Sequence, residues 1–505
     1  MSTMTTTTYE AASDDRGLGA WSEIFRAVRS ANDDYVIEGK TIAARAERLL
    51  LNDAHMAALM RAMTSHLIGT GIALIPQYQA DDAPDSTEAE RAMRRQISAA
   101  LRRRAMGKAL DAAGQLTQPA FFKQLIVTAF VHGDAFAVRQ VVQGRTRWRI
   151  VHPCRISNPE RTSDTATRFQ GVELRAGQPI GIHVLCRPND LPAIAQAGSS
   201  GSGDDRWQFI PWSDDTGCPN VVHYVPDQSR AGQVRGVSMF APLILNARHL
   251  MRAQSAYVSG KAIQASHPIV IKTANPAAAQ AAQASALSHA GAIGVDSPRI
   301  AFIDPKSEVV LTQIDYNGAD HKDFIDACLR TLTAAWGLPW QYVVHQLTDA
   351  NLASAQAALD QAEQTFADYH AEFCESVCRP IDLSLIHQAK LDGELPAELD
   401  ADRAVAGDYS RPRRSDANRL RSSQAAQMRL DMGVSRTTVF AELDYDFENE
   451  TRKRVEEDRF LQAQGVVVPG TAAGDAASGH DSIEKDEDQE DQEGQEEKSK
   501  PEAKP

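Results

Sequence analysis

Three side chains able to bind a metal recur along one predicted helix in the second half of the chain. His370, Cys374 and Cys378 are spaced i, i+4, i+8 and share a helical face. At about 1.5 Å per residue the outer two stand roughly 12 Å apart, whereas zinc ligands lie about 2 Å from one ion. At most two of the three can bind one metal, so the pattern favours helix packing over a metal site.

Two glycine motifs could bind phosphate groups, and both fail on context. Gly39-Lys40-Thr41 lacks the earlier glycine of a P-loop, because that position is Asp34. Gly69-Thr70-Gly71 lies between a predicted helix and a predicted strand, the reverse of the order in a dinucleotide-binding fold. No nucleophile elbow, Ser-His-Asp order or paired acidic motif stands out. We therefore expect no catalytic residue, no cofactor, no metal and no enzymatic activity.

The most informative stretch is a pair of long helices joined by a polar loop. Apolar residues follow one face from 324 to 336, Asp320 is expected to cap this helix, and Gly337 and Pro339 are expected to end it. The second helix (353–380) has a seven-residue repeat of apolar side chains and needs a partner helix from this chain or a neighbour. The repeat consists of Leu352, Leu359, Phe366 and Phe373. A loop held between two rods suits a protein that lines a passage.

Periodicity along the rest of the chain predicts a mixed α+β fold that is mostly helical. Further helices are expected at 43–68, 86–107, 119–131, 239–266, 276–290, 384–392, 416–432 and 447–464. Strands are expected at 72–76, 136–142, 146–151, 221–225, 267–272, 299–304 and 308–314. A small α/β unit is thus inserted between two long helices, 239–266 and 319–336.

Composition indicates several domains and an acidic end. A chain of 505 residues can hold two to four domains. The first residues lack the features of a secretion signal, no run of about eighteen apolar residues predicts a membrane span, and the scattered cysteines fit a reducing cytoplasm. The net charge is −14, and residues 475–505 hold twelve Asp and Glu against four Lys. This end should be disordered, as a solubilising tail or a docking segment.

Basic residues gather in places that allow two interpretations. The clusters at 94–104 and 411–421 could form solvated faces or subunit salt bridges, or lie near nucleic acid. Arg248 and Arg252 are four residues apart on the long helix 239–266, and Lys261 follows on the same helix. The two arginines could face a lumen or the acidic side chains of a neighbouring copy. Trp336 and Trp340 flank the helix break and are expected to pack.

Three segments resemble the lambda-type portal proteins of tailed bacteriophages, within about 43–465. They are ARAERLLLNDAHMAALMRAMTSHLIGTGIALIPQ, the run VVHYVPDQSRAGQVRGVSMF with the long helix after it, and FIDACLRTLTAAWGLPWQYV followed by NLASAQAAL. The second contains Gly232, Gln233, Arg235 and Gly236. The chain departs from the family pattern at Ala353-Ser354-Ala355-Gln356, where Ser-Ser-Ala-Arg is common, and at Asp416-Ala417, where Asp-Pro is common.

The resemblance implies a portal fold with named regions. These are a mobile N-terminal arm (1–42), a wing (43–238 and 353–412), two stem helices (239–266 and 314–337), a small α/β clip (267–313), a tunnel loop (338–352), a helical crown (413–465) and a disordered acidic tail (466–505).

The resemblance also implies a function. About twelve copies would form a homo-oligomeric ring at one capsid vertex, through which double-stranded DNA is packaged and ejected. Expected partners are the terminase large subunit, the major capsid and scaffold proteins, head-completion or tail adaptor proteins and non-specific double-stranded DNA, with no membrane. The protein would reside in the virion, and in the host cytoplasm during assembly.

Seven residues are candidates for the DNA channel. Four of them lie in the loop and are neutral polar groups, which can touch phosphates without the adhesion that counterion release gives to Lys and Arg. The other three are basic residues of the first stem helix. The loop candidates are Gln341, His345, Gln346 and Asn351, and the stem candidates are Arg248, Arg252 and Lys261. Two alternatives are another structural virion adaptor, such as a minor head or tail component, and an enzymatic subunit of the packaging motor. The latter would need a P-loop or an acidic metal cluster.

Overall fold

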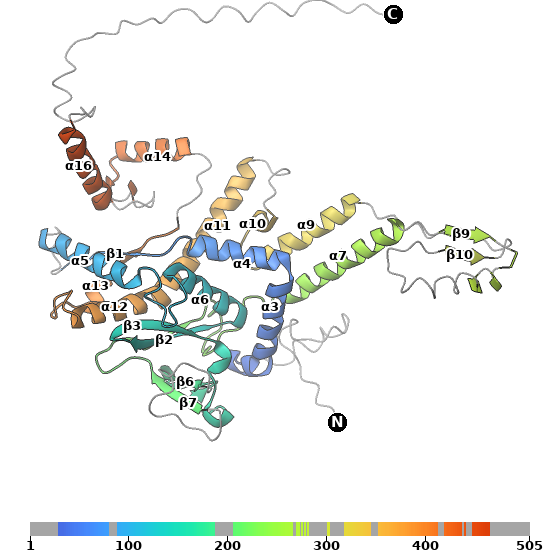
Figure 1. Cartoon of the computed structure of the whole chain (residues 1–505), viewed down its shortest axis with the longest axis horizontal. Helices are drawn as coiled ribbons and strands as arrows, with labels where there is room; N and C mark the ends of the chain where they lie inside the picture. The colour runs from blue at the N-terminus through green and yellow to red at the C-terminus, as the bar shows by residue number, and fades with distance from the viewer. Residues whose placement is uncertain are drawn as a thin grey trace, which may run out of the picture. The chain divides into compact units, whose positions relative to one another are not determined.

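Figure 1 shows the computed structural model of the chain. It describes residues 29–79, 88–186, 206–265, 269–272, 274–275, 277–278, 280–281, 300–303, 318–344, 352–412, 419–436, 439–440 and 447–464. The chain divides into two compact units, Met1–Arg414 and Ser415–Pro505. The predicted acidic tail, the predicted strand 308–314 and most of the predicted helix 276–290 lie outside the described residues.

The described residues form a mixed α+β structure that is mostly helical, as predicted. Among the described residues, the α-helices of the first unit are α2 (Ala31–Asp34), α3 (Lys40–Asn52), α4 (Ala54–Leu67), α5 (Glu88–Ala105), α6 (Gln118–His132), α7 (Ile244–Ala265), α9 (Gly318–Ala334), α10 (Gln341–Val344), α11 (Leu352–Phe373), α12 (Arg379–Leu391) and α13 (Ala401–Ala404). The described part of this unit also contains the π-helical turns η3 (Tyr35–Gly39) and η7 (Cys374–Cys378) and the 3₁₀ turns η4 (Pro153–Arg155) and η5 (Pro159–Arg161). The second unit contains α14 (Arg419–Asp431) and α16 (Phe447–Ala463).

Four small sheets are present in the described part of the first unit. The strands are β1 (Leu74–Pro76), β2 (Ala135–Val142), β3 (Arg145–Val151), β4 (Arg168–Phe169), β5 (Val172–Arg175), β6 (Gln178–Cys186), β7 (Arg206–Pro211), β8 (Val221–Tyr224), β9 (Ile269–Lys272), β10 (Ile300–Ile303) and β11 (Gly407–Tyr409). They pair in the orders β1-β11, β3-β2-β8, β4-β5-β6-β7 and β10-β9, and only the last pair is parallel. The predicted hairpin is confirmed: Val142 lies opposite Arg145, and Gly144 takes a positive φ of 74° between them.

The predicted helix 43–68 is two helices, because an aspartate divides it. Asp53 is extended, and its Oδ1 accepts hydrogen bonds from the backbone N–H groups of His55 at 2.8 Å and Met56 at 2.9 Å. A side chain that satisfies the first free N–H groups of a helix starts a new one. The turn at Asp53 lets α3 and α4 place separate apolar faces in the same core.

The helices predicted separately at 353–380 and 384–392 are continuous in the structure. The structure continues from α11 through the π turn η7 into α12, with Pro380 in the first turn of α12. The wider π turn accommodates a residue that has no N–H to donate. Within the predicted seven-residue repeat, Phe366 and Phe373 are buried, and the Phe366 ring stacks on His66 of α4 with centroids 4.5 Å apart. The partner helix belongs to the same chain.

A large apolar core joins the helices to the three-stranded sheet. Trp148 of β3 is fully buried, and its Nε1 donates to the Ser384 hydroxyl of α12 at 3.0 Å. A second, smaller core lies between β2, β8 and the four-stranded sheet, around Phe136, Ile182 and Val184. These two cores form the body from which the helix pair α7 and α9 departs (Figure 1).

Candidate functional site

The helices α7 and α9 lie side by side, as Figure 1 shows, and an aromatic stack joins them. The Tyr257 ring of α7 stacks on His321 of α9, with centroids 3.6 Å apart and planes at 4°. The Lys261 Nζ lies 5.6 Å from the centroid of the Tyr257 ring, a cation–π geometry. In sequence, the parallel pair β9–β10 lies between the two helices. The inserted unit predicted from the sequence is therefore bracketed by two helices that contact one another.

The end of α9 is anchored by a tryptophan. The Trp336 ring is buried, meets Phe130 and Phe240 edge to face, and donates from Nε1 to the Met239 carbonyl at 2.9 Å. Gly337 follows with a φ of 68°, the left-handed residue expected at a helix end. The predictions that Trp336 packs and that Gly337 ends the helix are confirmed. Asp320 lies inside α9, which begins at Gly318, so its assignment as the cap was wrong.

The start of α7 is anchored by close backbone contact with the end of α6. The Phe130 carbonyl accepts from the Met239 N–H at 3.0 Å and from the Ser238 hydroxyl at 3.1 Å. Gly133 and Gly236 touch backbone to backbone, so that a Cβ added at Gly236 would overlap the Gly133 carbonyl oxygen. The predicted helix 239–266 begins five residues late, at Ile244, because the segment before it makes turns against α6.

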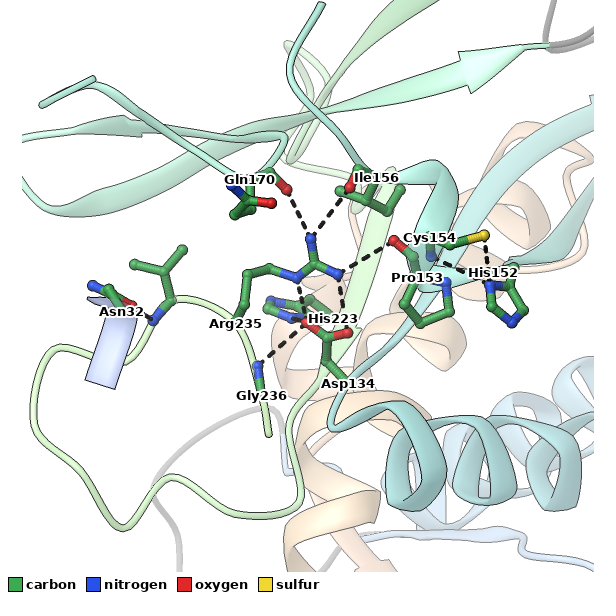
Figure 2. A network of polar contacts seen from close by, with 11 residues as sticks. Asn32, Asp134, His152, Pro153, Cys154, Ile156, Gln170, His223, Arg235 and Gly236 are labelled. Carbon is green, nitrogen blue, oxygen red and sulfur yellow. Dashed lines mark hydrogen bonds and ion pairs between the residues drawn. The ribbon is translucent and has the colours of Figure 1, made fainter. Parts of the chain in front are cut away.

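Arg235 sits at the centre of this anchor with all five of its N–H donors engaged (Figure 2). Nε and Nη2 donate to the two carboxylate oxygens of Asp134 at 2.5 and 3.2 Å. The remaining donors go to the backbone carbonyls of Pro153, Ile156 and Gln170, at 3.3, 3.3 and 2.7 Å. The guanidinium also lies over the rings of Tyr35, at 5.3 Å, and Phe136, at 5.1 Å. One side chain thus joins its own segment to four other stretches of chain.

The ion pair stays charged although both partners are buried. Burial alone would raise the pKa of Asp134, but Arg235 and the hydrogen bond from His223 lower it to about 2. Burial would likewise lower the pKa of Arg235, and Asp134 holds it above its ordinary value. His223 reaches the same carboxylate at 3.4 Å and stacks on Phe136 at 4.2 Å. Because protein groups engage all five Arg235 donors, the guanidinium has none left for a ligand, and the cluster acts as a structural clamp.

The first described helix is tied to the same segment. Asn32 donates to the Gly232 carbonyl and accepts from the Val234 N–H, both at 3.0 Å. Arg230 pairs with the buried Asp34 at 2.6 Å. These contacts lock the residues that precede α7 against α2 and η3, so the base of α7 is held from two sides.

The structure separates the predicted channel residues. His345, Gln346 and Asn351 lie outside the described residues. Gln341 opens α10, and its Oε1 is a buried atom with no hydrogen-bond partner in the described part of the chain. Arg248 and Arg252 are exposed on the side of α7 turned away from α9, whereas Lys261 is half-buried and shares the α9-facing side with Tyr257. The three stem residues therefore do not form one basic surface.

The other sequence-predicted positions are structural. His370, Cys374 and Cys378 are buried, and His370 Nδ1 lies 3.0 Å from the Leu67 carbonyl, as the packing interpretation predicted. In the basic helix α5, Arg104 pairs with Asp392 and Glu394, each at 2.6 Å, and Arg103 pairs with Glu394. These ion pairs favour the salt-bridge interpretation of that cluster, although they form within the subunit.

Local sequence patterns do not predict the clamp. Arg235 stands out only as part of the motif from Gly232 to Gly236, and Asp134 belongs to no motif. A usable signal was Gly133-Asp134, because a carboxylate directly after a helix-ending glycine and at the start of an apolar strand will be buried and needs a cation. Which of the many arginines supplies it depends on the tertiary fold.

A family model and two curated relatives that match this chain are all phage portal proteins. Residues 19–369 match the family model "Phage portal protein, lambda family". Portal protein B of Escherichia phage lambda is 23% identical over 238 residues, covering 46% of this chain and 43% of the relative. The portal protein of Escherichia phage N15 is 24% identical over 243 residues, with the same coverage. The matched region thus spans less than half the length of these curated relatives.

A solved structure also superposes on this chain. The neck of an empty GTA particle, computed with C6 symmetry, superposes with a TM-score of 0.41 at 12% identity, covering 81% of this chain and 99% of that chain. Within the described ranges, no helix is long and apolar enough to cross a lipid bilayer.

Proposed function

This chain belongs to the lambda family of phage portal proteins, a family of structural proteins and not of enzymes, and from that membership we propose that it forms a ring at one capsid vertex through which double-stranded DNA passes. About twelve copies would close the ring by heterologous contacts, in which each subunit uses two different surfaces. The ring would admit the genome during packaging and release it at ejection. The protein would be a virion component that assembles in the host cytoplasm.

One observation carries this proposal: the helix pair α7–α9 is firmly anchored at its base and brackets an inserted unit. Arg235 and Trp336 fix the two ends that join the body, so repeated copies would present similarly placed helices around an axis. In this interpretation α7 and α9 are the stem, 267–313 the clip, 338–352 the tunnel loop, 413–465 the crown, and the body the wing. The clip would dock the terminase large subunit and later the head-completion or tail adaptor proteins. Other parts of the ring would meet the capsid and scaffold proteins.

Images of the purified full-length protein test the ring directly. Negative-stain particles should be rings with a central hole wide enough for duplex DNA. Compact monomers or open filaments at assembly concentrations would contradict the proposal. Rings without a hole would point to a structural adaptor of the virion instead.

The loop prediction is tested by adding positive charge. Neutral residues would let DNA slide, whereas each Lys or Arg at a phosphate makes the wall adhesive. We expect Gln346→Lys with Asn351→Lys to stall packaging, with shorter protected DNA in a procapsid protection assay. Gln346→Ser with Asn351→Ser, which keeps the loop neutral, is the control. An unchanged protected length in the lysine variant would argue against DNA contact at this loop.

A further inference from the structure

The outer side of α7, turned away from α9, is exposed and carries positive charge. Tyr257 faces α9, as its stack on His321 shows, and Leu250 on the same side is fully buried. At about 100° per residue, Arg248, Arg252, Ser255 and Ser259 fall on the opposite side of the helix. All four are exposed. We call these four residues the α7 outer face.

The outer side of α9 carries a negative charge, Asp323, near the N-terminal end of the helix. His321, Ile325 and Leu332 point toward α7 and the core, and Leu332 is fully buried. The opposite side holds Asp323, Ala327, Arg330 and Ala334, all exposed. Asp326, half-buried, lies beside this row. We call these four exposed residues the α9 outer face.

The stacked rings set the two faces in register along the helix axes. Because α7 and α9 run in opposite directions and Tyr257 is level with His321, Ser255 is level with Asp323. Arg252 lies three residues from that level, about 4.5 Å along the axis, which is within the reach of an arginine side chain. It is level with Asp326. Within one chain, however, the bodies of both helices separate Arg252 from Asp323.

A neighbouring copy removes that separation. We infer that the α7 outer face of one copy packs against the α9 outer face of the next, and that Arg252 pairs with Asp323 across this contact. The inference rests on the ring proposed above, since heterologous contacts join two different faces of one chain and a ring is the closed form of such an assembly. It assigns Arg252 to the contact between copies and not to the DNA channel.

Three further features fit a second copy as the occupant. Small residues, Ser255 and Ser259 on one face and Ala327 and Ala334 on the other, allow two helices to approach closely. The apolar side chains that flank the faces are partly exposed: Met251 at 38%, Val258 at 66% and Phe324 at 45%. Apolar groups exposed beside a complementary charged row are typical of an interface. Arg330, which is level with Arg248, lies over the Trp340 ring at 5.6 Å and is held by its own chain.

Charge reversal in the full-length protein tests the contact. Arg252→Glu and Asp323→Arg should each raise the protein concentration needed for half-assembly at least about tenfold, because each places like charges across the interface. The double variant restores opposite charges in the swapped order and should return to within about threefold of the wild type. Ring content would be measured by native mass spectrometry across a dilution series.

A matched control is Arg102→Glu, which makes the same charge change at an exposed position on α5. It should assemble like the wild type, and circular dichroism should show that all variants fold. If the wild type forms rings and the single variants assemble equally well, the inference alone is overturned. The same holds if the double variant assembles no better than the single variants. Wild-type protein that forms no rings would overturn the proposed function and this inference together. Intact Arg252→Glu rings that package DNA poorly would return Arg252 to the channel.

Discussion

At the scale of single residues, the clamp shows why an arginine and not a lysine stands at position 235. Five donors fixed in one plane meet a carboxylate and three carbonyls that come from three segments of the chain. A lysine has three donors on one atom and could not reach the same acceptors. The residue combines charge neutralisation of Asp134 with satisfaction of backbone groups that would otherwise be buried without partners.

The clamp predicts a large loss of stability when its charge balance is removed. Asp134→Asn leaves the Arg235 guanidinium buried without a counter-charge, which should cost about 3–5 kcal/mol of unfolding free energy. Urea denaturation followed by circular dichroism measures this. Arg379→Gln, which breaks an exposed i, i+4 ion pair with Glu375, should change stability by less than about 0.5 kcal/mol. Equal losses in the two variants would contradict the assigned role of Asp134.

A second residue makes stability depend on pH. Asp382 is buried, accepts a hydrogen bond from the Tyr409 hydroxyl at 3.2 Å, and its pKa is raised to about 7, chiefly by burial. An unfolded aspartate has a pKa near 3.9. Between about pH 4 and pH 7 the Asp382 carboxyl is therefore protonated in the folded state and mostly ionised in the unfolded state. In that window the contribution of Asp382 falls as pH rises, by at most about 1.4 kcal/mol per pH unit.

We expect Asp382→Asn to remove this slope. The variant should be more stable than the wild type at pH 8. The difference should shrink toward pH 4, where the wild-type carboxyl is protonated in the folded state and about half protonated in the unfolded state. Unfolding free energies from urea titrations at four pH values measure the trend. A wild-type and variant difference that does not change with pH would show that Asp382 ionises normally.

At the scale of elements, the sequence predicted where helices and strands lie better than how they join. The hairpin, the Gly337 stop and the strand at 221–225 followed from local signals, since alternation, glycine and proline act within a few residues. The joins depend on neighbours. The helix breaks at Asp53 because its side chain accepts hydrogen bonds from the first N–H groups of α4. Helix α7 starts late because the segment before it bonds to the end of α6. The helix continues through Pro380 because a π turn precedes that residue. The clamp of Arg235 was beyond local reasoning, since Asp134 is far from it in sequence.

The element-scale prediction concerns the anchor of α9. Trp336→Leu removes the hydrogen bond to Met239 and two edge-to-face ring contacts, and leaves space beside Phe130. We expect faster hydrogen exchange in 318–334 and at the start of α7, with α4 less affected, because the loss is local to the base of the helix pair. Loss of a buried tryptophan ring should cost about 3 kcal/mol or more. Uniformly faster exchange throughout the first unit would indicate a general core defect instead.

At the scale of the whole molecule, the two units differ in how they are stabilised. Both apolar core clusters of the described residues consist of side chains from the first unit, the last of them Val405. In the second unit, α14 and α16 leave large apolar side chains partly exposed, among them Met428, Val455 and Phe460. A helix with such a surface gains most of its stability from packing partners.

This difference predicts independence of the first unit. A chain ending at Arg414 should unfold cooperatively with the same melting temperature as the corresponding transition of the full chain, within about 2 °C by the usual size scaling. Differential scanning calorimetry of both chains measures it. A chain ending at Leu391, which removes β11 and the β1–β11 pairing, should instead melt earlier. A truncation at Arg414 that aggregates or loses its transition would show that the second unit is required.

The touching backbones of Gly133 and Gly236 limit how this lineage can diverge. Neither site tolerates even one added carbon, and the obstructing atoms are main-chain atoms that no neighbouring substitution can shrink. A descendant that changes either glycine must therefore reroute the whole stretch leading into α7. In distant relatives, keeping both glycines would signal that this junction is still built in the same way, and losing one would signal a different attachment of the helix.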